Sequence, residues 1–172
     1  MDWILGRWGK WNFKSIVKEV AIAGIVIFIL SNIMSYMRSP ELSSTQLPQL
    51  EVKLLDGKQY VHDSGRALVL HFWATWCPTC KLEAANIESV SKDYEVLTIA
   101  VNSGADVELN SYMKENDFTF KVLNDNDGTW AKQFKVGAYP TTFIYDAKGE
   151  LRFTEVGYTT TVGLLARLKL TE

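Results

Sequence analysis

The longest apolar stretch of the chain lies near its amino terminus. Residues 20–37 are 18 consecutive uncharged residues, and those before Ser31 are almost all aliphatic. A helix of this length spans about 27 Å, close to the roughly 30 Å of a bilayer hydrocarbon core. Lys18 and Arg38 flank the run, and their long side chains can reach the two interfaces. We therefore predict a transmembrane anchor at residues 20–37.

The charges on either side of this run predict its orientation. Four basic residues precede it, between Arg7 and Lys18, whereas only Arg38 follows it closely. Because positive charge favours the cytoplasmic side, we expect residues 1–19 to be a cytoplasmic tail and the rest to lie beyond the membrane. A cleaved signal peptide and a buried core helix are the alternatives. The first lacks a clear cleavage site, and the second is rarely so uniformly aliphatic.

After the apolar run, the pattern changes twice. Residues 38–49 are polar and contain two prolines, which predicts a linker. Residues 50–172 alternate between apolar runs and amphipathic segments, and they are numerous enough to bury a core of their own. The elements expected in this domain are a hairpin at 52–61, strands at 67–73, 96–101 and 118–122, helices at 82–94, 107–116 and 129–134, a second hairpin at 141–156, and a final helix at 161–170.

The order of these elements predicts the fold class. Strands alternate with helices, and a hairpin and a last helix follow. This order is typical of an α/β domain in which a mixed central sheet is flanked by helices on both faces.

Composition and charge exclude several classes of protein. The chain has 172 residues, of which 47% are hydrophobic and 22% charged, so it is not a disordered tail or a low-complexity array. Its formal net charge of −2 argues against a nucleic-acid-binding protein. With only two cysteines it cannot be a disulfide-stapled miniprotein or a four-cysteine zinc module.

The two cysteines carry the candidate chemistry. Cys77 and Cys80 are separated by Pro78 and Thr79, where a predicted buried strand gives way to a helix. In the first turn of a helix, residues three apart lie on one side, so the two sulfurs can form a bond. Unpaired N–H groups and the helix dipole favour a thiolate on Cys77, which makes it the expected nucleophile and Cys80 the resolving thiol.

Two other roles for the cysteine pair stay open. The pair could be half of a zinc site with His62 and His71, although these histidines would have to converge from different strands. It could also be a structural disulfide, but so small a loop gains little stability from one. We favour a redox site with no metal.

The residues around the pair resemble a known family. Phe72-Trp-Ala-Thr-Trp-Cys-Pro-Thr-Cys80 is similar to the active site of the thioredoxin superfamily, in particular the membrane-tethered branch that includes TlpA, ResA, CcmG (DsbE) and ScsD. Val136-Gly-Ala-Tyr-Pro-Thr-Thr-Phe143 resembles the cis-proline loop of that family. The resemblance implies a thioredoxin-like fold over about residues 50–170, with the TlpA-type insertion at residues 107–122.

The resemblance also implies roles for individual residues. Pro140 is expected to form a cis peptide bond and to pack against the cysteines, and the backbone of Tyr139 to pair with an extended substrate. The alternative is an ordinary turn that begins a strand. Trp76 is expected to shape an apolar platform near the sulfurs, and Pro78 and Thr79 complete the redox motif.

The chain departs from the family at two places and matches it at a third. His71 replaces an aspartate that is common in thioredoxins; it is either an acid/base group for Cys80 or a core histidine bonded to backbone. Glu83 matches a glutamate that follows the active site in many TlpA-like proteins, and its alternative is a solvated helix residue. The Gly-Val-x-Gly-Ala-Pro-Glu loop of cytochrome-maturation members is absent, which disfavours CcmG.

The function implied is thiol–disulfide exchange without a dissociable cofactor. We expect a protein in the bacterial inner membrane whose periplasmic domain reduces disulfides in extracytoplasmic proteins. A DsbD-like membrane reductase is the expected electron donor. An oxidase or isomerase of the same fold and a copper- or zinc-binding thiol chaperone are the alternatives.

Overall fold

A computed structural model describes residues 13–42, 44–63 and 65–171. The chain divides into two compact units, Met1–Met37 and Arg38–Glu172, which are described separately. In the first unit, helix α1 (Phe13–Arg38) contains the predicted apolar run and begins within the segment predicted as a tail. Residues 1–12 of that tail lie outside the described residues. By length and composition, α1 can cross a membrane, as an anchor or as a signal.

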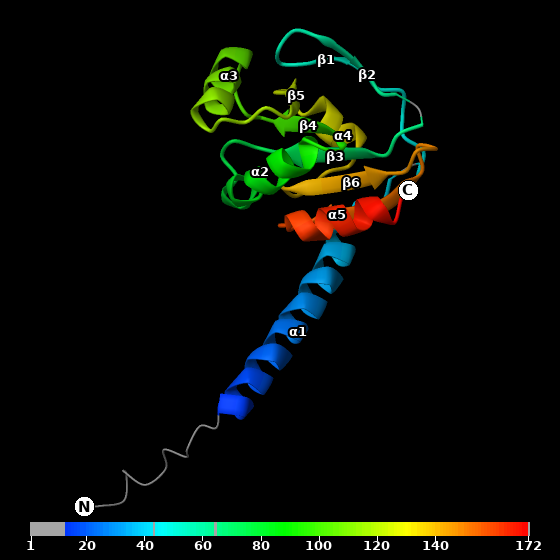
Figure 1. The fold of residues 1–172 in the computed structure, drawn as a ribbon. Coiled ribbons are helices and arrows are strands. Elements are labelled where there is room, and N and C mark those ends of the chain that lie inside the picture. Colours follow the sequence, from blue (N-terminus) through cyan, green and yellow to red (C-terminus); the bar gives the residue numbers. More distant parts are fainter. Residues whose placement is uncertain (1–12, 43, 64, 172) are drawn as a thin grey trace, which may run out of the picture. The chain divides into compact units, whose positions relative to one another are not determined.

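The second unit is built on a mixed five-stranded sheet (Figure 1). Its strand order is β5-β4-β3-β6-β7, with β3, β4 and β5 parallel to one another and β6 and β7 antiparallel to their neighbours. The strands are β3 (Leu68–Trp73), β4 (Glu95–Val101), β5 (Lys121–Asp125), β6 (Thr141–Tyr145) and β7 (Leu151–Val156). A separate hairpin pairs β1 (Glu51–Lys53) with β2 (Gln59–Val61).

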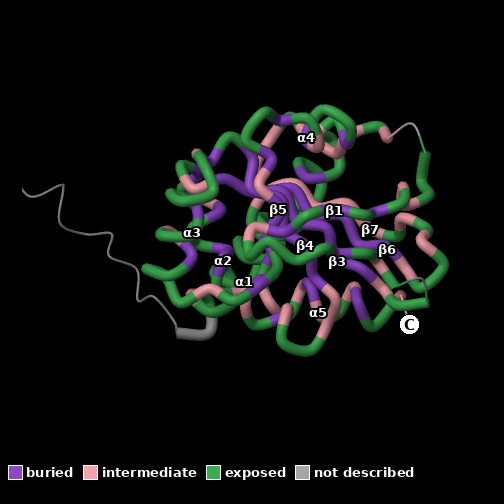
Figure 2. The backbone as a smooth tube through the Cα atoms, turned by 90° about the horizontal axis from the view of Figure 1, so that it is seen from above, coloured by how far each residue is buried: buried purple, intermediate pink, exposed green. Residues whose placement is uncertain are grey.

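Four helices among its described residues complete this unit. They are α2 (Pro78–Ser91), α3 (Asp106–Glu115), α4 (Thr129–Gln133) and α5 (Thr161–Lys169). The predicted α/β fold with a mixed sheet and flanking helices is thus confirmed. The central strands form the buried middle of the domain, as Figure 2 shows.

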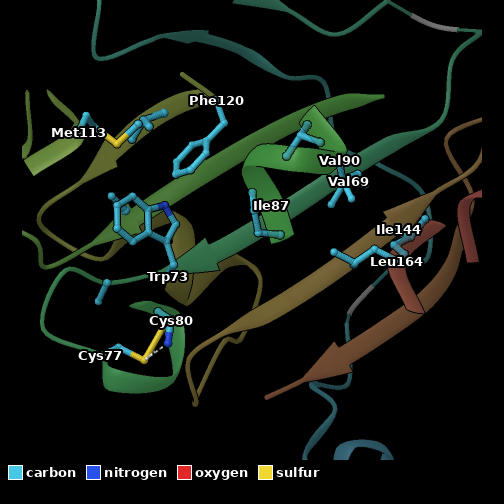
Figure 3. Packing of buried hydrophobic residues seen from close by; sticks show 14 of the residues in the cluster. Val69, Trp73, Cys77, Cys80, Ile87, Val90, Met113, Phe120, Ile144 and Leu164 are labelled. Carbon is cyan, nitrogen blue, oxygen red and sulfur yellow. Dashed lines mark hydrogen bonds between the residues drawn. A yellow bond between two sulfur atoms is a disulfide. The ribbon is translucent and has the colours of Figure 1, made fainter. Parts of the chain in front are cut away.

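Alternate residues of each strand point to opposite faces of the sheet and build two cores. On one face, Val69 and Trp73 of β3 pack with side chains from α2, α3 and α5 (Figure 3). This cluster contains both cysteines, and we call it the cysteine face. On the other face, Leu68, Leu70 and Phe72 pack with the β1–β2 hairpin and α4. We call this side the hairpin face.

The end of the predicted linker differs from the expectation. The backbone N–H of Leu47 donates to Gly149 O at 2.8 Å, and that of Leu151 donates to Thr45 O at 2.8 Å. Leu42 and Leu47 also pack against the hairpin-face core. Residues from about 44 onward are therefore an ordered part of the domain, because the apolar side chains of this mostly polar segment pack against the hairpin-face core.

The strand predicted at 118–122 is displaced. Strand β5 begins at Lys121, three residues later than expected. The alternation of Phe118, Thr119 and Phe120 resembles a strand, but the two rings stack on each other at 5.2 Å between centroids. Phe120 also packs edge-on against Trp73 at 5.9 Å. Tertiary aromatic contacts, rather than ladder pairing, explain the apolar pattern before β5.

Candidate active site

Cys77 lies at the junction between β3 and α2. It is the N-cap residue of α2, with an extended backbone (φ −85°, ψ 115°), and Pro78 occupies the first helical turn. Proline is favoured there because its missing N–H has no partner within the helix. The N–H of Cys80 donates to Cys77 Sγ at 3.2 Å. A sulfur thus occupies the position where a serine or aspartate oxygen usually caps a helix, close to the positive end of its dipole.

The two cysteines form a disulfide across the first turn of α2. Their Cα atoms are 5.2 Å apart, within the usual range for a bridged pair. Cys77 is 5% exposed and Cys80 only 1%. An incoming sulfur therefore meets Cys77 first, while Cys80 lies deeper in the cysteine face.

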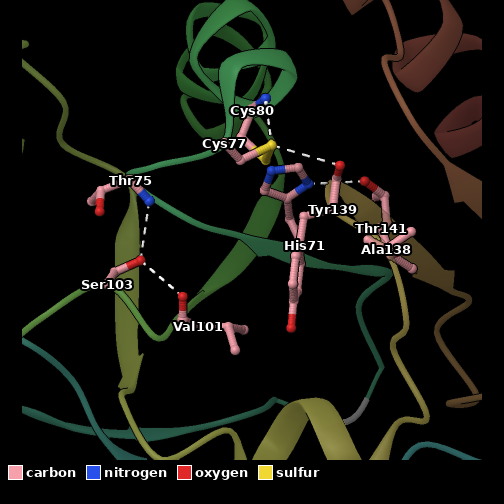
Figure 4. The surroundings of a disulfide bond; sticks show 10 residues. His71, Thr75, Cys77, Cys80, Val101, Ser103, Ala138, Tyr139 and Thr141 are labelled. Carbon is pink, nitrogen blue, oxygen red and sulfur yellow. Dashed lines mark hydrogen bonds between the residues drawn. A yellow bond between two sulfur atoms is a disulfide. The ribbon is translucent and has the colours of Figure 1, made fainter.

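The loop before β6 lies against this disulfide. The Tyr139–Pro140 peptide bond is cis, as the resemblance implied, and the alternative of an ordinary turn is wrong. The carbonyl oxygen of Tyr139 lies 3.6 Å from Cys77 Sγ (Figure 4). Once the disulfide is reduced, a Cys77 thiol can donate to this carbonyl. Pro140 is buried and Tyr139 is half-buried beside the sulfurs.

Trp76 forms an exposed aromatic surface next to Cys77. Its side chain is 57% exposed, and its ring packs edge-on against Tyr139 at 5.8 Å. Its Nε1–H donates to the carbonyl of Asn102 at 3.0 Å. Ring packing and this hydrogen bond fix the orientation of the indole, as expected for an apolar platform. Pro78 is exposed and Thr79 is half-buried on the same turn.

Two residues of the loop after β4 support the turn before Cys77, and the sequence pattern did not identify them. Ser103 accepts a hydrogen bond from the Thr75 N–H at 3.0 Å and donates to Val101 O at 3.0 Å (Figure 4). Asn102 has a left-handed backbone, with φ of 46°, which turns its carbonyl towards Trp76. A polar loop after a buried strand was the only signal available for them.

His71 is buried on the cysteine face, and neither of its predicted roles describes its contacts fully. The side chain is 2% exposed, and Nδ1 lies 2.9 Å from Thr142 Oγ1. It is therefore bonded to a side chain rather than to the backbone. Burial lowers the pKa of His71 to about 3, so the imidazole is neutral at physiological pH. Among the described residues, His71, His62 and the two cysteines do not form a group that could hold a metal ion, which the zinc alternative requires.

Glu83 is fully buried one turn along α2 from Cys80, so the solvated-helix alternative is wrong. Its Oε1 accepts the N–H of Thr159 at 3.3 Å, and Oε2 has no hydrogen-bond partner among the described residues. Burial raises the pKa of Glu83 to about 8, and the nearby charge of Glu155 adds to the rise. A carboxyl group with a pKa near neutrality can both take up and release a proton at working pH.

Comparisons with known proteins show which family the chain resembles. The model of the AhpC/TSA family matches residues 42–154. A thioredoxin-like protein of Haemophilus influenzae is 26% identical over 165 residues, which cover 94% of this chain and 98% of that protein. The thiol-disulfide oxidoreductase ResA of Oceanobacillus iheyensis is 27% identical over 152 residues, or 83% of this chain and 79% of that protein.

The fold agrees as well. The crystal structure of the exposed lipoprotein thioredoxin of Streptococcus pneumoniae superimposes with a TM-score of 0.65 at 27% identity. The match covers 72% of this chain and 99% of that structure. The chain therefore belongs to the thioredoxin-like AhpC/TSA family and is a thiol–disulfide oxidoreductase that carries a Cys77–Cys80 disulfide.

Proposed function

We propose that this protein is a membrane-tethered reductase of disulfides in extracytoplasmic proteins. The observation that carries the proposal is the position of Cys77. Its sulfur caps α2, accepts the Cys80 N–H at 3.2 Å and lies 3.6 Å from the carbonyl of the cis-proline loop. One sulfur thus has a thiolate-stabilising environment and an adjacent backbone to which an extended substrate can pair.

The exchange proceeds in two steps. In the reduced protein, the Cys77 thiolate attacks one sulfur of a substrate disulfide, and the other substrate sulfur leaves as a thiolate that takes up a proton. Cys80 then loses its proton and attacks Cys77 Sγ. The substrate leaves with both sulfurs reduced, and the Cys77–Cys80 disulfide is formed.

The proposed acceptor of the Cys80 proton is Glu83. The two side chains are three residues apart on the buried side of α2, and Glu83 Oε2 has no other hydrogen-bond partner among the described residues. The pKa of about 8 makes the ionised form accessible at neutral pH. A substitution that removes this carboxyl is expected to slow the second step more than the first.

The groups around the Cys77 sulfur support the proposed direction of exchange. Strong oxidants of this fold class owe their potential to a stabilised reduced form. Here, among the described residues, the sulfur of Cys77 contacts backbone groups only, the Cys80 N–H and the Tyr139 carbonyl, and no Lys, Arg or His side chain donates to it. The buried acid Glu83 opposes a further negative charge nearby. This environment favours a reductase.

The location is supported by the amino-terminal helix and by the relatives. The match to the Haemophilus protein leaves about ten residues of this chain uncovered, so it extends into α1. The similar pneumococcal protein is described as an exposed lipoprotein. We propose α1 as a retained anchor in the bacterial inner membrane, with the tail cytoplasmic and the domain periplasmic. A DsbD-like membrane reductase is the proposed electron donor.

A trapping experiment tests the roles of the cysteines. The Cys80→Ser variant should accumulate mixed disulfides with other proteins through Cys77, visible as shifted bands on non-reducing gels. The Cys77→Ser variant, as the matched control, should not. Trapping by Cys77→Ser alone would reverse the two roles.

A second experiment tests the direction and the metal alternative. Equilibration of the Cys77–Cys80 pair with glutathione gives its potential, and the full-length protein should also reduce insulin disulfides. A potential above that of glutathione would instead support an oxidase. Metal analysis after anaerobic purification separates a thiol chaperone, which would carry stoichiometric copper or zinc and lack exchange activity.

Labelling tests the topology. A membrane-impermeant maleimide applied to reduced spheroplasts should modify Cys77 without lysis. Modification only after lysis would place the domain in the cytoplasm and overturn the proposed location.

A further inference from the structure

A row of polar side chains crosses the cysteine face beneath the disulfide. In the sheet register, His71 of β3 is paired with Thr98 of β4 on one side and with Thr142 of β6 on the other. All three side chains are buried, with exposures of 2%, 0% and 0%. They share this face with Val69 and Trp73, which pack in the same cluster as the cysteines.

The ring of His71 is directed towards the disulfide. Figure 4 shows Nδ1 turned to the strand β6 and the opposite edge of the ring turned to the sulfurs. Cys77 Sγ already has contacts with the Tyr139 carbonyl and the Cys80 N–H, and Cys80 is the more deeply buried of the two. Among the described residues, no hydrogen bond reaches the sulfur of Cys80, so this sulfur has acceptor capacity left for His71 Nε2.

A count of hydrogens identifies the tautomer of His71. The Thr98 hydroxyl donates its proton to Lys121 O at 2.9 Å, so it cannot also donate to His71. The contact of Thr142 Oγ1 with His71 Nδ1, at 2.9 Å, is the one hydrogen bond of that hydroxyl among the described residues. If Nδ1 carried the proton, the buried Thr142 hydroxyl would have no acceptor, which is unfavourable. The Thr142 O–H therefore donates to Nδ1, and the ring proton is on Nε2.

We propose that, once the disulfide is reduced, the neutral His71 ring donates an Nε2–H hydrogen bond to the sulfur of Cys80 and stabilises its thiolate, and that Thr142 is the positioning residue that fixes this tautomer. The inference rests on the proposed exchange function and adds a sulfur-facing donor to it. The proton of Cys80 goes to Glu83, as above, and His71 keeps its own. Its low pKa agrees with this division, because an imidazole that resists protonation is a poor base and a good neutral donor.

The test measures the thiol of Cys80 in the Cys77→Ser background. Thiolate absorbance is followed against pH in the full-length protein. A hydrogen bond to a charged group is strong enough that its loss should shift the thiol–thiolate equilibrium of Cys80 by about tenfold or more. His71→Asn, whose amide reaches only the Nδ1 position, should raise the pKa of the Cys80 thiol by about one unit. His71→Gln, whose amide reaches the Nε2 position, should restore most of the shift.

The two threonines give a matched pair of controls. Thr142→Val and Thr98→Val each remove one buried hydroxyl next to His71, with almost no change in volume. Only Thr142→Val should raise the pKa of the Cys80 thiol. Glu83 titrates one turn away on α2 and could affect the same measurement. Each variant is therefore also measured in combination with Glu83→Gln, and the differences in Cys80 thiol pKa between variants should remain.

The tautomer itself is observable without any substitution. Nitrogen NMR of His71 in the reduced wild-type protein should show a protonated Nε2 and an unprotonated Nδ1 at neutral pH. A protonated Nδ1 would overturn the inference, as would equal shifts for His71→Asn and His71→Gln or for the two threonine variants. None of these measurements uses a substrate, so failure of the proposed reductase direction would appear separately, in the glutathione equilibrium.

Discussion

The two faces of the central sheet are built by the same strands but differ in chemistry. On the hairpin face, β3 contributes Leu68, Leu70 and Phe72, each completely buried among apolar neighbours. On the cysteine face, the same strand places His71 between Val69 and Trp73, and Glu83 of α2 is buried close by. Burying polar groups is unfavourable unless they are paired, and Glu83 Oε2 has no partner among the described residues.

This difference separates stability from chemistry. The hairpin face supplies hydrophobic burial, which holds β3 in place and with it the start of α2. The cysteine face contains buried titratable groups that lower stability at some pH values, and one of them, Glu83, is the proposed acceptor of the Cys80 proton. Substitutions on the hairpin face should therefore change folding and leave the redox equilibrium intact, whereas those on the cysteine face should change both.

The largest effect is expected for Phe72→Ala on the hairpin face. The ring packs against Phe134 at 5.3 Å and Phe143 at 5.8 Å between centroids. The cavity left behind should lower the free energy of unfolding by about 3–5 kcal/mol, measured by urea denaturation. The glutathione equilibrium of the folded variant should stay within about twofold of the wild type. A tenfold change in that equilibrium would show that the two faces are not separable.

The second-largest effect on the free energy of unfolding is expected for Glu83→Gln, and its size depends on pH. The unfolded chain releases the Glu83 proton near the ordinary pKa of 4.5, whereas the folded protein holds it until about pH 8. Ionisation therefore destabilises the fold as pH rises from about 5 to 8. The glutamine variant lacks this loss and should be more stable than the wild type at pH 8 by about 2–4 kcal/mol. At pH 4 the two should be nearly equal.

The exchange rate gives an independent measurement on the same variant. Glutamine keeps the contact with the Thr159 N–H but cannot accept a proton, so insulin reduction should slow while the fold is more stable. A variant with unchanged rate would contradict the proposed proton transfer. A stability difference that does not vary with pH would contradict the assigned pKa.

The smallest effect is expected for Glu155→Gln on β7. Its charge contributes to the raised pKa of Glu83, less than burial does, and it also pairs with Arg167 Nε at 2.6 Å. Carbon NMR should show the Glu83 carboxyl titrating at a lower pH, by a fraction of a unit. Lys58→Gln, at an exposed ion pair with Asp56, is a control that should leave this titration unchanged. An upward shift would be inconsistent with the stated cause.

Much of the fold is predictable from local sequence. The near-continuous apolar residues of β3 and β4 identify buried strands, and Gly57 and Gly149 mark the turns, each with a positive φ. The Cys77-Pro78 pair fixes the start of α2. The family motifs locate the cis-proline loop and the cysteines, because a few residue types there meet specific chemical needs.

Other features depend on contacts between distant segments. Nothing in the local pattern distinguishes a buried Glu83 from a solvated one, since α5 and Thr159 approach it from more than seventy positions away. Thr142 becomes important only through its register with His71. The start of β5 was misplaced because aromatic packing on Trp73 produces the same alternation as a strand.

The edges of the sheet limit how other chains can bind. The Thr45–Leu47 segment bonds to the turn and start of β7, and Leu55 N donates to Val122 O on β5 at 2.8 Å. Unprotected edge strands invite pairing with further chains and lead to aggregation. A neighbouring segment thus occupies part of each border, at Val122 on one side and at the start of β7 on the other, and hinders crowded copies of this protein from pairing there.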